Sequence, residues 1–345
     1  MEKMKAAMFY APGDVRIEEV ELPRVGDKEI LVRVKIALTC GTDVKSYRRG
    51  YSLFKPPCLF GHEWAGDVVE VGESVSGFKE GMRVVGHNTA PCGRCYYCKK
   101  GYHSMCEFLM DNLLLGAYAE YIKVPSAIVE QNLFEIPDEI SYKAAALLEP
   151  LSCVVYGTDE IGIQLGDSVV INGAGPIGLM FVRLAKLKGA RVISCDLSEQ
   201  RLAVARKIGA DETINVSHTK DQVASVQELT EDKRGVDVAI EATGFPKVWE
   251  MTILMARKAG KVLLFGGCKA GTTITVGTEL LHYSQLTLKG VFHTTPRHVK
   301  TAYDLITRRM MPEDLLVTDE VPLSETVKAL EMHLHQAGIK IAIVP

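Results

Sequence analysis

A glycine-rich turn stands between an apolar stretch at 168–172 and an amphipathic stretch that ends near Gly189. The turn consists of Gly173, Ala174, Gly175, Pro176, Ile177 and Gly178. Gly173 permits the tight bend, Gly175 lets the backbone approach a pyrophosphate, and Gly178 lets the helix pack on the strand. The free N–H groups and the dipole at the helix N-terminus favour an anion there. Glycine clusters occur in many turns, but the order strand, turn, helix predicts a dinucleotide-binding site on a parallel sheet.

An acidic residue follows at the spacing that such a site uses for the adenosine ribose. The apolar stretch at 191–195 ends in Asp196, 23 residues beyond Gly173. A carboxylate there accepts hydrogen bonds from the ribose hydroxyls and repels a 2′-phosphate, which predicts NAD rather than NADP. Arg201 leaves an alternative open, because a basic residue just past the acid can assist a phosphate, pack on the adenine or lie in solvent.

The pattern of apolar residues changes twice along the chain. From residue 4 to about 150, short β-branched runs are broken by Gly and Pro, which predicts an antiparallel β-domain. From about 152 to 289, apolar strand patterns alternate with helical patterns, which predicts βαβ units on a parallel sheet. The remaining tail has two helical patterns and one strand pattern, at 340–344. It has too few strands to fold alone, so we expect one domain to be inserted between two parts of the other.

Composition excludes several classes of function. The formal net charge is −3, with 40 Lys and Arg against 43 Asp and Glu, so no global basic field favours nucleic acid or an anionic membrane. Neither a signal-peptide pattern nor a run long enough to span a bilayer is found, which predicts a soluble, cytoplasmic protein. In that compartment the nine cysteines are expected to bind metal rather than to form disulfides.

Four of the cysteines stand close together in a loop with the spacing C-x2-C-x2-C-x7-C. They are Cys92, Cys95, Cys98 and Cys106. Four thiolates on a short loop suit a closed, tetrahedral, structural Zn²⁺ site. An iron–sulfur cluster is the competing interpretation of the spacing, and a zinc ribbon that grips nucleic acid is a weaker one.

Three further fragments carry potential ligands. Cys40, His62 and Glu149 stand in Cys40-Gly41-Thr42-Asp43, Gly61-His62-Glu63 and Leu148-Glu149-Pro150. Singly, each has a plain structural explanation: a small buried thiol, a core histidine and a surface acid at a helix end. Together, these residue types match a catalytic zinc, which keeps one position open beside about three protein ligands.

With these motifs the chain resembles the zinc-dependent medium-chain dehydrogenases, in the polyol (sorbitol-like) and threonine dehydrogenase branch. The resemblance covers essentially all 345 residues and includes the segments VRVKIALTCGTD, GHEWAGDVVEVGESVSGFKEGMRV, LLEPLSCVVYG, INGAGPIGLM, EATG and LKGVF. It implies an α/β protein with a GroES-like, β-rich catalytic domain, 1–152 plus 290–345, and a doubly wound Rossmann NAD-binding domain, 153–289. It also implies a homo-oligomer, a tetramer or a dimer formed through strands at the edge of the Rossmann sheet.

The resemblance assigns roles to individual residues. Cys40 and His62 become zinc ligands, and Glu63 and Glu149 become carboxylates that bind the metal directly or through water. Thr42 becomes the first member of a proton relay. Besides the residues already named for the cofactor, it assigns to NAD the residues Phe265, Gly266, Val291 and Phe292.

The resemblance predicts hydride transfer from a secondary alcohol of a polyol or sugar derivative to NAD⁺, with a ketone as product. The chain departs from relatives near the substrate: Lys45 replaces a frequent histidine, Ser46 a frequent aromatic residue and His293 a common arginine. Lys45 and His293 are therefore candidate contacts to a phosphorylated or acidic sugar, although Lys45 in a solvated basic face, with Arg48 and Arg49, explains the pattern about equally well. L-Threonine 3-dehydrogenase is the alternative activity, and a relative that lost its chemistry is the non-enzymatic one.

Overall fold

The computed structural model describes residues 2–51 and 54–345. The chain forms two compact units, Met1–Ser152 with Thr294–Pro345, and Cys153–His293. We call them the catalytic unit and the nucleotide unit. The nucleotide unit lies, in sequence, between two segments of the catalytic unit, and it ends at His293, four residues later than the 289 given in the sequence analysis. The reason is that strand β14 (Thr287–Gly290) pairs along its whole length with the parallel sheet of the nucleotide unit.

The catalytic unit is built on β-sheets. One sheet has the strand order β15-β16-β3-β5-β6-β8, with β7 also paired to β3, and a smaller one has the order β2-β1-β4. Their bounds are β1 Lys3–Ala11, β2 Asp14–Glu21, β3 Ile30–Leu38, β4 Cys58–Leu59, β5 Glu63–Val71, β6 Arg83–Gly86, β7 Tyr121–Val124, β8 Leu133–Glu135, β15 Val317–Pro322 and β16 Lys340–Val344. Most pairings are antiparallel, as the sequence predicts, and β15 with β16 is parallel.

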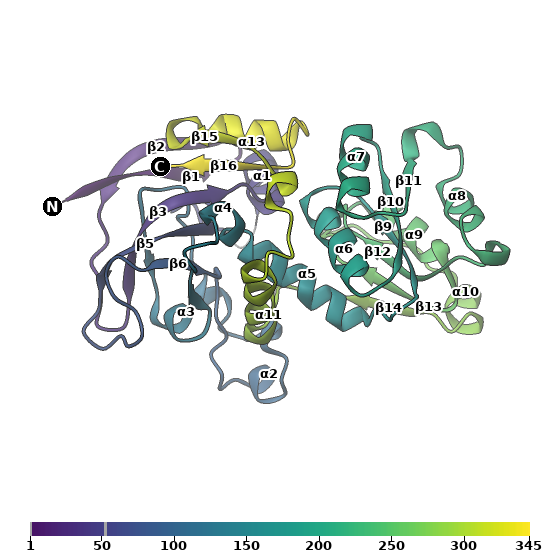
Figure 1. The fold of residues 1–345 in the computed structure, drawn as a ribbon, viewed down its shortest axis with the longest axis horizontal. Helices are drawn as coiled ribbons and strands as arrows, with labels where there is room; N and C mark the ends of the chain where they lie inside the picture. Colours follow the sequence, from purple (N-terminus) through teal and green to yellow (C-terminus); the bar gives the residue numbers. More distant parts are fainter. Residues whose placement is uncertain (1, 52–53) are drawn as a thin grey trace. The chain divides into compact units, whose positions relative to one another are not determined.

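Strand β3 lies in the middle of this unit and explains why the tail returns to it. Its residues are buried except Arg33 and Lys35, and it pairs with β5, β7 and β16. The last strand pattern of the chain, β16, thus completes a sheet begun by residues 30–38 (Figure 1). The helical segments of the unit are α1 Gly41–Arg49, α2 Tyr96–Lys99, α3 Ser126–Gln131, α4 Tyr142–Ala145, the start of α5 Leu148–Ile161, α11 Pro296–Thr307, α12 Glu313–Leu316 and α13 Thr326–Leu334.

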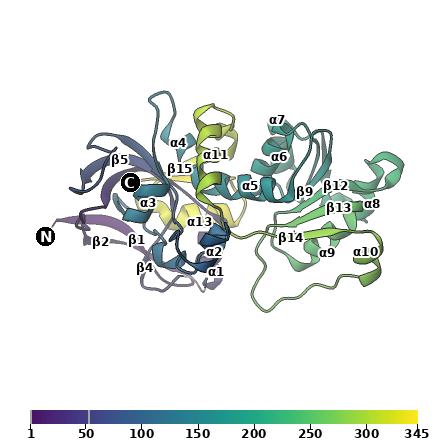
Figure 2. The ribbon, with the colours of Figure 1, turned by 90° about the horizontal axis from the view of Figure 1, so that it is seen from below.

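The nucleotide unit contains a parallel sheet with the strand order β11-β10-β9-β12-β13-β14. Its strands are β9 Ser168–Asn172, β10 Arg191–Asp196, β11 Glu212–Asn215, β12 Val236–Glu241, β13 Ala256–Leu264 and β14. Its helices are the rest of α5 together with α6 Pro176–Leu187, α7 Glu199–Ile208, α8 Gln222–Glu228, α9 Pro246–Met255 and α10 Thr278–Tyr283. Figure 2 shows α6 and α7 on one face of the sheet and α9 on the other. This is the doubly wound Rossmann order, with its switch point between β9 and β12.

Local sequence signals start the helices that flank β10. Gly175 is the N-cap of α6 and Pro176 occupies its first turn, where the missing N–H costs nothing. Ser198 is the N-cap of α7, and its hydroxyl accepts a hydrogen bond from Arg201 N. In the described part of the chain, every helix is too short or too polar to cross a membrane.

Candidate active site

Cys40, His62 and Glu63 come together in the catalytic unit. Their ligand atoms all lie within 4.8 Å of one another. Cys40 follows β3 and is the N-cap of α1, where its sulfur accepts a hydrogen bond from Thr42 N at 3.4 Å. His62 immediately precedes β5, and Glu63 is the first residue of that strand. Since β3 and β5 are paired antiparallel, the end of one strand and the start of the other meet, and Leu38 lies opposite Glu63.

Asp43 contacts the ring of His62, and Tyr118 in turn contacts Asp43. Asp43 Oδ1 lies 3.1 Å from His62 Nδ1, and both side chains are buried. The hydroxyl of Tyr118 donates a 2.6 Å hydrogen bond to Asp43 Oδ2. A carboxylate on one ring nitrogen leaves the other nitrogen available to a metal and fixes the orientation of the ring. Burial lowers the pKa of His62, but the charges of Asp43 and Cys40 more than reverse this and raise it well above its usual value.

Lys340 is a further member of the site that sequence reasoning did not find. Its Nζ donates to both oxygens of Glu63, at 2.7 and 2.5 Å, and to the carbonyl of Thr39 at 3.0 Å. Burial raises the pKa of Glu63, and the Lys340 ammonium opposes that rise. Lys340 and Glu63 are 277 residues apart, so no local motif could have joined them; the only signal was a lysine at the start of an apolar strand.

Glu149 lies in the first turn of α5 and is buried. It is therefore not a surface acid at a helix end, the alternative that its sequence position allowed. Its Oε1 lies 3.8 Å from His87 Nε2, which is longer than a hydrogen bond. Burial raises the pKa of Glu149, while His62 and Lys340 lower it. The carboxylate therefore belongs to the same electrostatic neighbourhood as the Cys40–His62–Glu63 group.

Thr42 and Lys45 both lie on α1, directly after the ligand Cys40. Thr42 is half-buried, and its carbonyl accepts a 2.8 Å hydrogen bond from Ser46 Oγ. Lys45 is half-buried, whereas Arg48 and Arg49 are exposed at the end of the helix. Of the three basic residues on this helix, Lys45 is the one partly withdrawn from solvent.

The four cysteines Cys92, Cys95, Cys98 and Cys106 converge as the spacing predicts, with their sulfur atoms within 4.8 Å of one another. Backbone N–H groups point at the sulfurs: Cys92 N donates to Cys106 Sγ at 3.3 Å, and Cys95 N to Cys92 Sγ at 3.4 Å. Hydrogen bonds from the backbone of Cys98 and of Glu107 lower the pKa of Cys95. Such donors favour thiolates, the form that binds a metal.

The donor chemistry of both groups fits zinc. Four sulfurs in one group make a closed tetrahedral set, and sulfur, nitrogen and carboxylate oxygen in the other make an open one. The chain thus has a structural zinc site of four cysteines and a catalytic site of Cys, His and Glu.

The glycine turn of the nucleotide unit has the geometry that its sequence predicts. Gly173 has φ = 101°, in the left-handed region that favours glycine. A Cβ on Gly178 would lie 1.7 Å from Gly173 O, so only glycine lets α6 start this close to β9. Pro176, Ile177 and Gly178 form the first turn of α6.

Asp196 and Arg201 both lie beside this turn. Asp196 ends β10; its Oδ2 accepts a hydrogen bond from Ala174 N at 2.7 Å and its Oδ1 one from Ser198 N at 2.8 Å. Arg201 points to the same place, since its terminal nitrogen lies 3.9 Å from where a Cβ on Gly175 would be. Burial lowers the pKa of Arg201, and the charge of Asp196 partly offsets this.

The other predicted cofactor residues follow the next strands of the sheet. Phe265 and Gly266 come directly after β13, and Val291 and Phe292 directly after β14. They therefore lie at the same carboxyl edge of the parallel sheet as the glycine turn. Phe265 packs edge-on against Phe181, and Phe292 is exposed. His293, at the end of the nucleotide unit, has φ = 63°.

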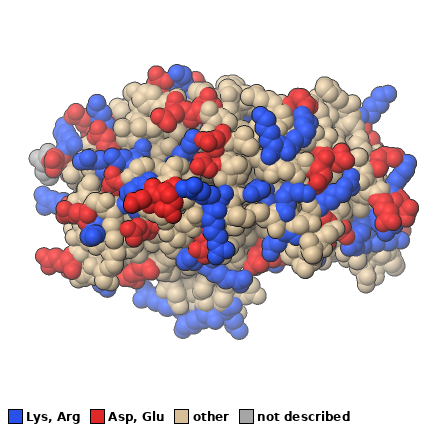
Figure 3. Space-filling view, in the orientation of Figure 1, with Lys and Arg blue, Asp and Glu red and all other residues tan. Residues whose placement is uncertain are grey.

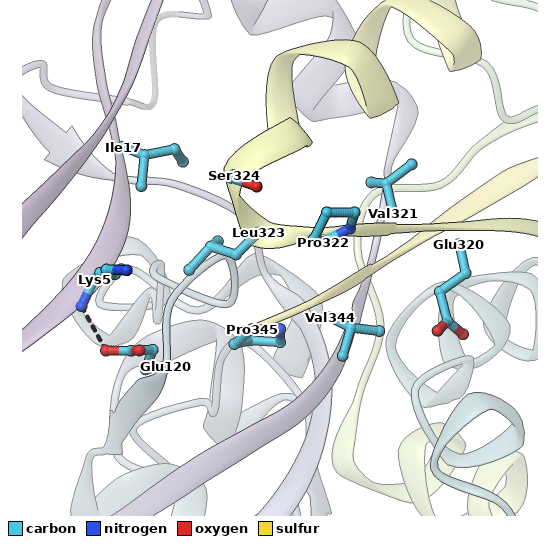
Figure 4. Close-up of a pocket in the computed structure, with 10 residues that line it drawn as sticks. All are labelled: Lys5, Ile17, Glu120, Glu320, Val321, Pro322, Leu323, Ser324, Val344 and Pro345. Carbon is cyan, nitrogen blue, oxygen red and sulfur yellow. Dashed lines mark hydrogen bonds between the residues drawn. The ribbon is translucent and has the colours of Figure 1, made fainter.

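A surface pocket of about 610 Å³ lies elsewhere in the catalytic unit (Figure 4). It is lined by residues of β1, β2, β15 and the C-terminus, among them Lys5, Glu120, Glu320 and Pro345, and contains no ligand of either metal group. On the face shown in Figure 3, basic and acidic side chains are interspersed, with a basic group over the four-cysteine loop.

Two family models match the chain. The alcohol dehydrogenase GroES-like domain matches residues 26–138, and the zinc-binding dehydrogenase domain matches residues 176–308. The sorbitol dehydrogenase of Bacillus subtilis (strain 168) is 33% identical over 100% of this chain and 98% of its own. The L-threonine 3-dehydrogenase of Pyrococcus horikoshii is 37% identical over 89% of this chain and 87% of its own. A crystal structure of a zinc-binding dehydrogenase from Sinorhizobium meliloti 1021, bound to NADP, superposes with a TM-score of 0.92 at 29% identity, covering 100% of both chains.

The chain therefore belongs to the zinc-binding medium-chain dehydrogenases. It is an NAD(P)-dependent zinc alcohol or polyol dehydrogenase that acts on a small molecule. The non-enzymatic alternative and the iron–sulfur interpretation of the four cysteines are discarded.

Proposed function

We propose that this dehydrogenase oxidises a secondary hydroxyl of a polyol or related sugar derivative to a ketone, with NAD⁺ as the hydride acceptor. The observations that carry the proposal are the group of Cys40, His62 and Glu63, whose ligand atoms lie within 4.8 Å of one another, and a second buried carboxylate, Glu149, in the electrostatic neighbourhood of that group. Simple alcohol dehydrogenases bind the catalytic zinc with two cysteines and one histidine. The site of this chain has one cysteine, Cys40, and carboxylates in place of the second.

In this proposal, metal binding and proton transfer are carried out by different residues of the site. Cys40 and His62 would hold the zinc, and Glu63 and Glu149 would supply the carboxylate ligand directly or through water. Bound zinc would polarise the substrate hydroxyl and stabilise the alkoxide. Thr42, fixed by its own N–H to the sulfur of Cys40, accepts the hydroxyl proton and passes it toward solvent. Bound NAD⁺ would accept the hydride of the carbinol carbon, so the substrate loses two hydrogens in all: a proton through Thr42, and a hydride that carries two electrons.

NAD is the proposed cofactor because Asp196 is a carboxylate at the end of β10, beside the glycine turn. A negative charge there opposes a 2′-phosphate. The Sinorhizobium meliloti relative is bound to NADP, so the choice between the two cofactors is a property to be measured on this chain.

An anionic substrate, a sugar phosphate or a sugar acid, is the refinement that Lys45 supports. Lys45 is half-buried on the helix that begins at the metal ligand Cys40. His293, the second departure from relatives, is the other candidate contact. L-Threonine is the second candidate substrate, because the threonine dehydrogenase of Pyrococcus horikoshii is 37% identical.

The test is NADH formation across a panel of neutral polyols, sugar phosphates, sugar acids and L-threonine, with wild type and Lys45→Ala. We expect Lys45→Ala to raise KM for an anionic substrate about tenfold or more, equivalent to about 1.4 kcal/mol, and to leave a neutral substrate nearly unchanged. Rising salt should weaken the anionic substrate in the same selective way. Lys35→Ala, on the exposed side of β3, is the control and should change neither.

Equal losses on charged and neutral substrates would show that Lys45 serves packing or the relay, and no loss would place it in solvent. Threonine as the best substrate would replace the polyol proposal. A wild-type preference for NADP would overturn the assignment of Asp196.

We also propose a homo-oligomer and a cytoplasmic location. The oligomer is supported by β14, which ends the strand order of the nucleotide unit and leaves one side for a second copy. The location is supported by four thiols arranged for a metal, a chemistry of reducing compartments. The mass in solution, measured by light scattering, tests the first proposal.

A further inference from the structure

Lys340 makes an unusual set of contacts beside the catalytic metal group. Its side chain is 2% exposed and that of Glu63 is 0% exposed, so water does not screen the pair. An ammonium has three N–H donors. The structure assigns all three to one small region, since Nζ reaches both oxygens of Glu63 and the carbonyl of Thr39.

The contacts join the two segments that bring in the metal ligands. Thr39 precedes Cys40, and Glu63 follows His62. Thr39 is itself fixed by the C-terminal part of the chain, because its Oγ1 lies 2.8 Å from His333 Nδ1 and accepts a hydrogen bond from Ile341 N at 3.0 Å. Lys340 therefore holds Glu63 from the side of β16.

The lysine and a zinc ion would draw on the same carboxylate, because each oxygen of Glu63 already accepts a hydrogen bond from Lys340. Both oxygens of Glu63 accept hydrogen bonds from an ammonium, whereas Oε1 of Glu149 lies 3.8 Å from His87. A carboxylate engaged by a buried cation donates less electron density to a metal, which keeps the metal a stronger Lewis acid. A thiolate and two fully donating carboxylates would instead leave the centre with a net charge of about −1.

We propose that Lys340 is a positioning residue that restrains Glu63 and limits its donation to the catalytic zinc. The inference rests on the proposed zinc ligands, but not on the substrate. It predicts that loss of the lysine releases Glu63 to the metal, so the catalytic zinc binds more tightly. A lysine with only a structural role would loosen the zinc when removed.

The experiment measures zinc at the catalytic site by competition with a chromophoric chelator, and the visible spectrum of the protein with cobalt(II) at that site. Lys340→Met should lower the dissociation constant for catalytic zinc about tenfold. The cobalt bands of Lys340→Met should shift and weaken as Glu63 donates more fully to the metal. Lys340→Arg, which keeps the charge, should stay near wild type. In a Glu63→Gln background, Lys340→Met should leave the cobalt bands in place, because no carboxylate is released.

Lys186 provides a matched control in the nucleotide unit. Its Nζ also bonds one carbonyl, Ala190 O at 3.1 Å, and both oxygens of a carboxylate, Asp211, at 3.0 and 2.8 Å. Lys186→Met should change neither the dissociation constant nor the cobalt spectrum.

Weaker zinc binding in Lys340→Met, or an unchanged cobalt spectrum, would overturn the proposal. If the methionine variant does not fold, Lys340→Gln, which keeps an N–H donor without the charge, carries the same test. No substrate enters these measurements, so a wrong substrate class in the proposed function leaves their outcome untouched.

Discussion

Asp43 supports the catalytic metal group without being one of its proposed ligands. It is fully buried, pairs with His62 and accepts a hydrogen bond from Tyr118. The residue stands three positions after Cys40, on the first turn of α1, and thus connects the two ligands through one helix. Burying this charge is tolerable only because both of its oxygens lie close to polar partners.

Replacing Asp43 by Asn should therefore weaken the catalytic zinc and lower kcat, each by about 10- to 100-fold, because the ring of His62 loses its anionic support. Metal analysis after dialysis against a mild chelator, together with steady-state kinetics, measures both effects. The zinc of the four cysteines should stay. Tyr118→Phe, which removes one hydrogen bond to Asp43, should show a smaller change in the same direction. Full zinc occupancy and normal kcat in Asp43→Asn would contradict this role.

Asp196 governs a second residue-scale prediction, on the cofactor. Asp196→Asn keeps an acceptor oxygen for one of the two N–H groups, of Ala174 and Ser198, that the carboxylate binds, and it removes the charge that repels a 2′-phosphate. The ratio of kcat/KM for NAD⁺ to that for NADP⁺ should fall about tenfold or more, as expected for loss of one charge-assisted interaction. Glu199→Gln, an exposed acid on α7 paired with Arg206, is the control and should leave the ratio unchanged. An unchanged ratio in Asp196→Asn would remove this residue from cofactor selection.

Among the elements, α1 and the four-cysteine loop show two ways to hold a ligand. Helix α1 holds Cys40 as its N-cap, so regular secondary structure fixes the sulfur. The loop at 92–106 contains only short helical turns, and its buried side chains are mostly the cysteines themselves with Leu109. Without a metal, that loop has few apolar contacts with which to fold.

Changing Cys95 to Ser should remove one zinc equivalent per chain and lower the thermal unfolding midpoint of the catalytic unit, because a structural zinc contributes directly to folding. Elemental analysis should find two zinc in wild type and one in the variant. Cys58→Ser, at a half-buried cysteine of β4 outside both metal groups, should keep both. Iron in the wild type, or a single metal, would contradict the two-zinc assignment.

At the scale of the whole molecule, each unit has its own sheet and its own carboxylates. As the pH falls, protonation of different carboxylates should therefore destabilise each unit. In the nucleotide unit, Asp237 accepts hydrogen bonds from Ser168 N and Oγ, both at 2.7 Å, and from Arg257 Nε at 2.6 Å. Burial raises the pKa of Asp237, but the contacts with Ser168 and Arg257 outweigh it and lower the pKa below its usual value. Because its pKa is lower in the folded than in the unfolded chain, Asp237 stabilises the unit fully at pH values above its unfolded-state pKa. This contribution is lost as the pH falls from there through the folded-state pKa.

Asp237→Asn should therefore lower the stability of the nucleotide unit at pH 7 by about 1–3 kcal/mol. The difference from wild type should shrink as the pH falls below about 4, where the wild-type carboxylate is protonated in the unfolded chain. Calorimetric scans from pH 7 to pH 3 measure this. Asp232→Asn, in an exposed pair with Arg234, should follow wild type at every pH. A constant difference between Asp237→Asn and wild type across that range would contradict the assignment.

Local pattern was sufficient for every feature that depends on neighbours in the chain. The glycine turn, the four-cysteine spacing and the strand at 340–344 each obey a short-range rule: left-handed backbone, thiol proximity and a continuous apolar run. The family resemblance then joined Cys40, His62 and the two acids, which no spacing rule connects. The structure brings the ligand atoms of Cys40, His62 and Glu63 within 4.8 Å of one another, and Glu149 lies outside that group. The alternation of strand and helix predicted the parallel sheet of the nucleotide unit, and the structure supplied the order of its strands.

Only the tertiary structure decided which charges are buried and with which partner. Lys340 reaches Glu63 because β16 pairs with β3 and β3 pairs with β5, a chain of sheet contacts across most of the sequence. Asp43 gains its role from Tyr118, 75 residues away. Because burial strengthens charge interactions and depends on packing from distant segments, the positions of these ionic side chains are a property of the fold and are invisible in any local stretch of sequence.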